Sequence, residues 1–514
     1  MTLLTDRRRF LHTAAGGSAL LGLGSQMAFL RGVPAVADEQ ASLDPSTVRL
    51  DPHVEPLVRL LEETPRERLL EAVAARIHEG LNYRDLLAAL LLAGVRNVQP
   101  RPSVGFKFHA VLVVNSAHIA SLASPASERW LPIFWSLDYF KSAQAQDERE
   151  GDWTMAAVDE SAVPPAHKAA AAFRDAMDRW DEAAADAAVA ALARSAGSHE
   201  VFEIFYRYGA RDFRSIGHKA IFVANAERTL ATIGWHHAEP VLRSLAYALL
   251  MHEGRNPAEH DLAPDRPWRE NLERAARIRN DWQHATADRE ADAAATAELL
   301  DTLRTGTVDE ACDLAVEVLN RGVNPQTVWD AAFAGAGEVI LRQPGIVALH
   351  AMTSANALFY AYQTSGNDMT RRLMLLQGVA FVPLFLDAAR ARGRVADRQI
   401  EAVAEAVDPQ DTAPELDDVF AEVNRDRHRA AAMALHYVKA GGRAEEVIDA
   451  ARRLVFLKGR NSHDYKFSSA VLEDYYNITP AWRDPYLAAG FMYFRGSEES
   501  DNALVERTRA ALST

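Results

Sequence analysis

Cysteine is almost absent from this chain of 514 residues, which contains only Cys312. A single cysteine excludes an intramolecular disulfide, a Cys-rich zinc module and a cluster held by several thiolates. Basic residues are also in the minority, because 71 acidic side chains face 56 lysines and arginines and the formal net charge is −15. Nucleic acid and anionic membrane surfaces are poor partners for such a chain. We therefore predict no nucleic-acid partner.

Familiar catalytic motifs are missing as well. The chain has no G-x-x-x-x-G-K-[ST] phosphate loop, no strand-embedded G-x-G-x-x-G, no G-x-S-x-G elbow and no H-E-x-x-H pair. Cys312 lies in a stretch patterned with Ala, Leu and Val, which indicates a small core residue rather than a nucleophile. Candidate chemistry must therefore be sought in side chains outside these motifs.

Residues 1–37 have the features of an export signal rather than of a folded domain. Three consecutive arginines at 7–9 precede an apolar, glycine-rich stretch over 13–30, and Ala35-Val36-Ala37 supplies a small-residue cleavage pattern. The apolar stretch is too short and too rich in small residues to be a stable membrane span. We expect no later segment to be long and apolar enough to span a bilayer. We predict a single mature domain over 38–514 with no stable membrane span.

The segment from Asp6 to His12 resembles the twin-arginine export motif, in which a polar residue precedes two arginines, any residue, Phe and Leu. It differs at its ends, where Asp6 replaces the usual Ser or Thr and His12 replaces the usual Lys. The resemblance implies a bacterial protein, periplasmic or secreted, with the twin-arginine export machinery as a partner. Proteins of this class are exported folded, often because a cofactor is inserted first.

Beyond Asp38 the chain predicts an all-α fold. Strand signals are nearly absent, and apolar residues recur three and four positions apart in windows rich in Ala, Leu and Arg. Four windows share a further pattern, in which a histidine is followed six or seven positions later by small and polar residues. These windows run from His109 to Asn115, from His218 to Asn225, from His350 to Asn356 and from His463 to Ser469.

The surroundings of the four histidines repeat too, since a Gly-containing turn and a helix precede each one and another helix follows it. We predict about four three-helix repeats that form an α-solenoid or, if the ends meet, a closed α-helical toroid. The repeat cores are expected at about 70–145, 190–255, 310–390 and 428–498. Extra helices are expected in the Ala-rich, charged stretches 168–195 and 265–305.

His109, His218, His350 and His463 are the candidate metal ligands. Equivalent positions of successive repeats point toward one axis, so the four imidazoles are expected to converge. A histidine at the start of a helix faces the positive end of the dipole, which favours the neutral, metal-binding ring. Imidazole suits iron, copper or zinc. The alternative is that each histidine satisfies backbone groups or packs at a repeat junction.

Polar side chains accompany the histidines and are the candidate cofactor-binding residues, namely Asn115, Asn225, Thr353 and Asn356. These groups are costly to bury unpaired, so we expect them to face the axis and to orient the histidines by hydrogen bonds. Aromatic residues also cluster near the histidines. They either line a pocket for a flat organic molecule or stack one repeat on the next.

Two patches resemble the histidine-bearing helices of the questin oxidase-like family. One comprises His218–Ala226 together with Ala238–Ala246, and the other is Leu349–Ala355. That family is helical and includes a Baeyer–Villiger-type oxygenase that acts on polycyclic aromatic substrates. This chain differs by its export signal, because cytoplasmic NADPH is not available outside the cytoplasm. The resemblance therefore favours oxidation without defining a substrate.

Two functional hypotheses follow. The first is an exported, metal-dependent oxidoreductase that acts on a small organic, possibly aromatic, substrate at the multi-histidine site. The second is a non-catalytic α-solenoid that serves as a binding or scaffold protein of the cell envelope, since solenoids offer extended binding surfaces. The separation of the four histidines distinguishes the two, because one ion binds only ligands about 2 Å away.

Overall fold

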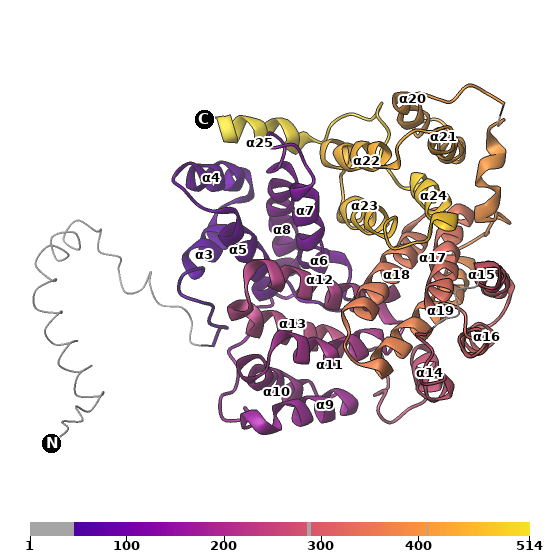
Figure 1. The fold of residues 1–514 in the computed structure, drawn as a ribbon. Coiled ribbons are helices and arrows are strands. Elements are labelled where there is room, and N and C mark those ends of the chain that lie inside the picture. Colours follow the sequence, from indigo (N-terminus) through magenta and orange to yellow (C-terminus); the bar gives the residue numbers. More distant parts are fainter. Residues whose placement is uncertain (1–45, 285–288, 409, 514) are drawn as a thin grey trace, which may run out of the picture. The chain divides into compact units, whose positions relative to one another are not determined.

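The computed structural model describes residues 46–284, 289–408 and 410–513 (Figure 1). Over these residues the secondary structure is helical and contains no β-sheet, so the predicted all-α class is confirmed. One compact unit extends from Val48 to Thr514. The predicted export signal at 1–37 lies outside the described residues.

The first half of the described chain runs from α3 to α13. Its helices are α3 (Glu55–Glu63), α4 (Arg66–His78), α5 (Tyr83–Asn97), α6 (His109–Leu112), α7 (Val114–Leu122), α8 (Leu131–Glu150), α9 (Ala169–Arg179), α10 (Glu182–Ser195), α11 (Ser198–Ala210), α12 (His218–Ile233) and α13 (Ala238–Leu249). A short 3₁₀ helix precedes α6 and another precedes α12, namely η1 (Phe106–Phe108) and η3 (Arg214–Gly217).

The second half runs from α14 to α25. Its helices are α14 (Arg266–Arg277), α15 (Arg289–Thr305), α16 (Val308–Asn320), α17 (Pro325–Arg342), α18 (Ile346–Thr364), α19 (Asp368–Arg390), α20 (Leu416–Glu422), α21 (Arg427–Lys439), α22 (Ala444–Lys458), α23 (Ser462–Asp474), α24 (Pro480–Ala489) and α25 (Ala503–Ser513). Helices α9, α10, α14 and α15 occupy the stretches in which the sequence predicted extra helices.

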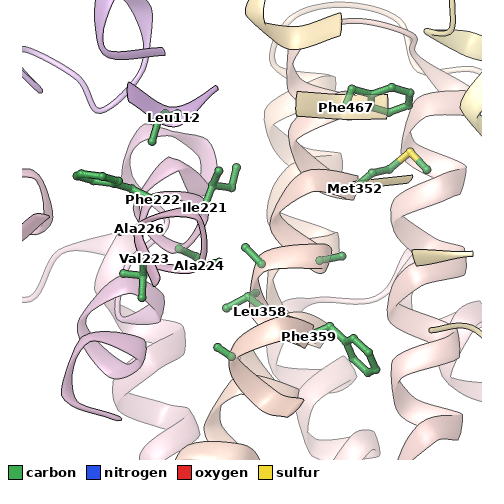
Figure 2. Close-up of a cluster of buried hydrophobic side chains, with 14 of the residues drawn as sticks. Leu112, Ile221, Phe222, Val223, Ala224, Ala226, Met352, Leu358, Phe359 and Phe467 are labelled. Carbon is green, nitrogen blue, oxygen red and sulfur yellow. The ribbon is translucent and has the colours of Figure 1, made fainter. Parts of the chain in front are cut away.

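Four helices from distant parts of the chain form a closed ring of contacts. Helix α7 packs against α12, α12 against α18, α18 against α23, and α23 returns to α7. Apolar side chains on the flanks of this ring are buried, among them Leu112, Phe222 and Phe359 (Figure 2). Burial of such side chains is the main stabilising contribution to folding, at roughly 2 kcal/mol each.

Each ring helix also contacts a helix that precedes it and a helix that follows it in the chain. The preceding helices are α5, α11, α17 and α22, and the following ones are α8, α13, α19 and α24. This set of contacts is compatible with four three-helix units. The repeat itself, and its arrangement as a solenoid or toroid, stays a prediction.

Helix α19 (Asp368–Arg390) is long and apolar enough to cross a membrane by length and composition alone. The expectation that no segment after the N-terminal one has this composition is therefore wrong. Its most apolar window is 83% buried within the structure, as in the core helix of a folded domain. Helix α19 packs against α17 and α18, and these contacts account for its apolar character.

Candidate metal centre

The structure brings the four predicted histidines together. One side-chain nitrogen from each of His109, His218, His350 and His463 lies within 4.8 Å of the other three. His109 and His218 are the first residues of α6 and α12, and His463 is the second residue of α23. His350 differs from the prediction, because it lies one turn inside α18, at its fifth position. The cluster can hold a metal ion.

Backbone carbonyls set the orientation of three of the four rings. In His109 and His218, Nδ1 faces a carbonyl oxygen in the turn that leads into the helix. In His350, Nδ1 faces a carbonyl oxygen one turn earlier in the same helix. The pairs are His109 Nδ1 with Phe106 O at 2.7 Å, His218 Nδ1 with Ser215 O at 2.5 Å and His350 Nδ1 with Ile346 O at 2.5 Å. A carbonyl can only accept, so Nδ1 carries the proton in all three rings and the Nε2 lone pair is left free.

The free Nε2 atoms point at one another. His218 Nε2 lies 3.0 Å from His109 Nε2 and 2.9 Å from His350 Nε2. With Nδ1 protonated, both members of each pair are acceptors, so a cation placed between them would bind both. His463 Nε2 is shielded from solvent and has no hydrogen-bond partner. The four rings therefore present an electron-rich centre suited to a metal cation.

The rings form a nearly square arrangement rather than a tetrahedron. Centroid distances between neighbours around the ring are 4.9, 4.3, 5.2 and 4.5 Å, and the His109–His350 diagonal is 6.5 Å. With metal–nitrogen bonds of about 2.0–2.1 Å, neighbouring nitrogens are about 2.9 Å apart in a square and about 3.4 Å apart in a tetrahedron. The two Nε2 distances are those expected between adjacent ligands of a square, and such an arrangement would leave positions open above and below the ion.

The pKa values of all four histidines are lowered, so the rings are neutral and ready to bind metal. Burial is the main cause in each, and the charge of Lys466 contributes in each. The pKa of His463 falls to about 3. The expected neutral state is thus present, but its main cause is loss of solvent rather than the start of a helix.

A strained turn delivers His218 to the site. Ser215 and Ile216 have φ values of 56° and 45°, and Gly217 follows at 79°. A Cβ atom at position 217 would lie 2.0 Å from Ser354 Oγ on α18, so only glycine fits there. This conformation turns the Ser215 carbonyl toward His218 Nδ1, which links the backbone strain to the orientation of the ring.

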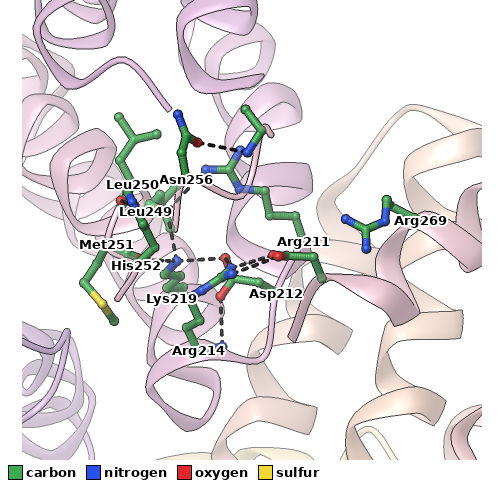
Figure 3. Close-up of polar contacts among 12 residues, drawn as sticks. Arg211, Asp212, Arg214, Lys219, Leu249, Leu250, Met251, His252, Asn256 and Arg269 are labelled. Carbon is green, nitrogen blue, oxygen red and sulfur yellow. Dashed lines mark hydrogen bonds and ion pairs between the residues drawn. The ribbon is translucent and has the colours of Figure 1, made fainter. Parts of the chain in front are cut away.

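Buried ion pairs hold both sides of this turn (Figure 3). The Lys219 ammonium donates to Asp212 Oδ2 at 2.8 Å and to the carbonyls of Leu249 and Met251 at 3.0 and 2.8 Å. Arg214 forms an ion pair with Asp212 at 3.3 Å. Because Asp212 precedes the turn and Lys219 follows it, their contact fixes its two ends and thereby the position of His218.

The predicted cofactor-binding residues gather in one small cavity beside the histidines, toward the carboxyl ends of the ring helices. Asn115, Asn225, Thr353 and Asn356 all line it. Its volume is about 20 Å³, enough for one water-sized group. Among the described residues these four side chains donate no hydrogen bond to an imidazole, and backbone carbonyls orient the rings instead. The expected orienting role is therefore wrong.

The cavity also contains Lys466 and Glu473 on α23, which the sequence analysis did not single out. Ser469 on α23 and Arg228 on α12 line it as well. Lys466, Ser469 and Glu473 follow His463 by three, six and ten positions, and this spacing places the three on one face of α23. Thr353 and Asn356 follow His350 by three and six positions, so the same offsets from His463 were the signal that could have found Lys466.

Other histidines and the cysteine lie outside the centre. His118 accepts or donates a hydrogen bond with Tyr83 Oη at 2.9 Å. His237 is buried at the start of α13 and, with His236 and His252, is not part of the four-histidine group. Cys312 is buried and its pKa is raised to about 12, which excludes a thiolate nucleophile.

No known family model matches the chain, and no curated protein or solved structure matches it significantly.

Proposed function

We propose that the protein is a metal-dependent oxidoreductase whose ion is held by His109, His218, His350 and His463. The observation that carries this proposal is the convergence of unprotonated Nε2 atoms at 2.9 and 3.0 Å. Each ring is held in that state from behind by a backbone carbonyl or by burial. Such support behind a ligand is typical of metal-binding histidines.

The arrangement favours a redox-active ion over structural zinc. Structural zinc is nearly always tetrahedral and closed, whereas a square of nitrogens suits copper or an octahedral iron with open positions. All four ligands are neutral and three are buried, so no ligand compensates the charge of the ion. Low polarity then favours the lower oxidation state, and a bound copper or iron would supply one-electron chemistry here.

Two exposed apolar side chains next to the ligands support a small organic substrate, such as an aromatic one. Phe106 is 72% exposed and Ile346 is 41% exposed. Their own carbonyl oxygens accept the Nδ1 protons of His109 and His350. An apolar substrate in contact with these two side chains would therefore lie next to the rings.

Export by the twin-arginine route, a periplasmic or secreted location and kinship with the questin oxidase-like family belong to the same proposal. They rest on the sequence motifs at 6–12, 35–37, 218–226 and 349–355. A metal loaded before export would explain the use of a pathway for folded proteins.

The test is metal analysis by plasma mass spectrometry, with an absorption spectrum, on protein purified folded. We expect close to one equivalent of copper or iron in the native protein and a loss of at least tenfold in the His218→Ala and His350→Ala variants. His118→Ala is the matched control, since His118 is a partly buried histidine outside the centre.

A metal-free native protein whose stability is unchanged by His218→Ala would contradict the proposal. The histidines would then be packing residues, and the alternative of a non-catalytic helical binding or scaffold protein would take its place. Bound metal that does not change its oxidation state with dithionite or ferricyanide would exclude the redox role alone.

A further inference from the structure

The cavity beyond the histidines lies along the inner faces of all four ring helices. Positions three to ten residues after each histidine line it, as a helix periodicity of 3.6 requires. They are Asn115 and Ser116 on α7, Ile221, Asn225 and Arg228 on α12, Thr353, Asn356 and Ala357 on α18, and Lys466, Ser469, Ala470 and Glu473 on α23. The cavity therefore lies beyond the histidines, farther toward the carboxyl ends of the four ring helices.

Two hydrogen-bond donors in this cavity have no partner. Lys466 is 3% exposed, and its Nζ atom has no acceptor within hydrogen-bonding distance. Ser469 Oγ is shielded from solvent and equally without a partner. An unpaired buried ammonium is expensive, and burial lowers the pKa of Lys466 to about 7. A charged lysine at such a position normally has an acceptor. Both groups line the same cavity, one helical turn apart on α23.

The other amide and charged side chains that line the cavity have hydrogen-bond partners of their own and do not supply the missing acceptor. Asn225 Nδ2 donates to Leu112 O at 3.0 Å, and Asn356 Nδ2 donates to Glu473 Oε2 at 2.8 Å. Arg228 forms an ion pair with Glu473 at 2.9 Å at the far end of the cavity. The Glu473 carboxylate is thus engaged by two donors, and the space beside Lys466 is left for an acceptor from outside the chain.

We propose that this cavity is a binding site for a small anion of one to three heavy atoms, which accepts hydrogen bonds from Lys466 and Ser469 and binds the metal on the same side. The proposal rests on the proposed metal centre and defines what occupies one of its open positions. The volume of about 20 Å³ is suited to a ligand of a few atoms and is too small for an organic molecule of substrate size. An organic substrate would therefore contact the opposite side, where Phe106 and Ile346 are exposed.

Azide is the probe, because it is small, anionic and visible in the infrared. It is titrated into the metal-loaded protein while its antisymmetric stretch and the metal spectrum are followed, and calorimetry gives the dissociation constant. We expect saturable binding in the native protein, weakened about ten- to a hundredfold in Lys466→Met and about threefold to tenfold in Ser469→Ala. Lys141→Met removes a half-buried lysine that does not line the cavity and serves as the control.

Lys466→Met replaces an unpaired buried charge by an apolar chain of similar length, so it should fold at least as well as the native protein. Thermal unfolding checks this, and Ser469→Ala gives a second, milder variant. Equal azide affinity in the native protein and Lys466→Met would overturn the proposal.

Failure of the metal centre is distinguishable from failure of the anion site. If the protein binds no metal, the titration is repeated on the metal-free protein. Azide binding that still depends on Lys466 would then support the anion site without the metal, and its absence would refute both.

Discussion

At the scale of single residues, the centre depends on which ring nitrogen carries the proton. Carbonyls of Phe106, Ser215 and Ile346 hold the proton on Nδ1, so Nε2 is directed inward without one. Burial adds to this by disfavouring imidazolium. A site built this way is competent for metal without any rearrangement of side chains, which lowers the free-energy cost of binding.

The lowered pKa of His463, about 3, predicts that the metal-free protein loses stability in acid. Unfolded histidine has a pKa of about 6.5, so below that pH the unfolded chain binds a proton that the folded chain does not. Stability is full above pH 6.5 and decreases as the pH falls toward the folded pKa. Each such histidine contributes a slope of about 1.4 kcal/mol per pH unit in this window.

Urea unfolding at pH 7, 6 and 5 checks this. The His463→Gln variant should have a shallower slope than the native protein, by up to about 1.4 kcal/mol per pH unit. The exposed His167→Gln variant controls for the substitution itself. Equal slopes in the native protein and His463→Gln would show that His463 is not buried in the neutral form.

At the scale of helices and turns, the residues that lead into a helix set the position of its histidine. Asn461 caps α23 by accepting from the His463 backbone N–H at 2.9 Å, and Asp464 completes the capping box. The turn before α12 is strained and needs Gly217, as well as the ion pair between Asp212 and Lys219. A capping box at α23 and a strained turn before α12 thus place His463 and His218 in similar positions.

Gly217→Ala should destabilise the protein by about 2–4 kcal/mol and reduce its metal content. The substitution adds backbone strain at a φ of 79° and a clash with Ser354 Oγ, which a Cβ atom would approach to 2.0 Å. Gly441→Ala is the matched control, because its φ is 103° and no atom lies within 4 Å of the added Cβ. The control should cost about 1–2 kcal/mol and leave the metal content unchanged.

Chemical denaturation and metal analysis on both variants measure the two effects. A Gly217→Ala protein with native metal content would show that the turn tolerates the change and that it does not orient His218.

At the scale of the whole molecule, the four ligands join helices that are far apart in the chain. The contact of α23 with α7 closes the ring, and outside it α25 packs against α4, where Arg507 forms an ion pair with Glu71 at 2.7 Å. A metal ion at the centre would bind one residue each from α12, α18 and α23, and His109 from α6, the short helix directly before α7. Its binding free energy would then be folding free energy for the whole ring.

Removal of the metal should therefore lower stability globally. A free metal concentration of 100 times the dissociation constant stabilises the folded protein by about 2.7 kcal/mol, and chelation removes that contribution. Calorimetric scans with and without a chelator should show a lower Tm for the chelated protein, with no shift for His218→Ala. A shift of the same size in His218→Ala would indicate that the metal binds elsewhere.

The sequence by itself determined the helical class, the four histidines and the polar residues that gather in one cavity. It did so because apolar periodicity and a recurring histidine pattern are local properties that can be read along the chain. Only the tertiary structure decided that the Nε2 atoms meet at 2.9 and 3.0 Å, that carbonyls orient the rings, and that Lys466 is buried without a partner. The meeting of the Nε2 atoms depends on contacts between residues more than 100 positions apart, and the state of Lys466 depends on the exclusion of water, and neither is encoded in any short stretch of sequence. The carbonyl contacts are local, three or four positions apart, but they require the exact backbone conformation of each turn.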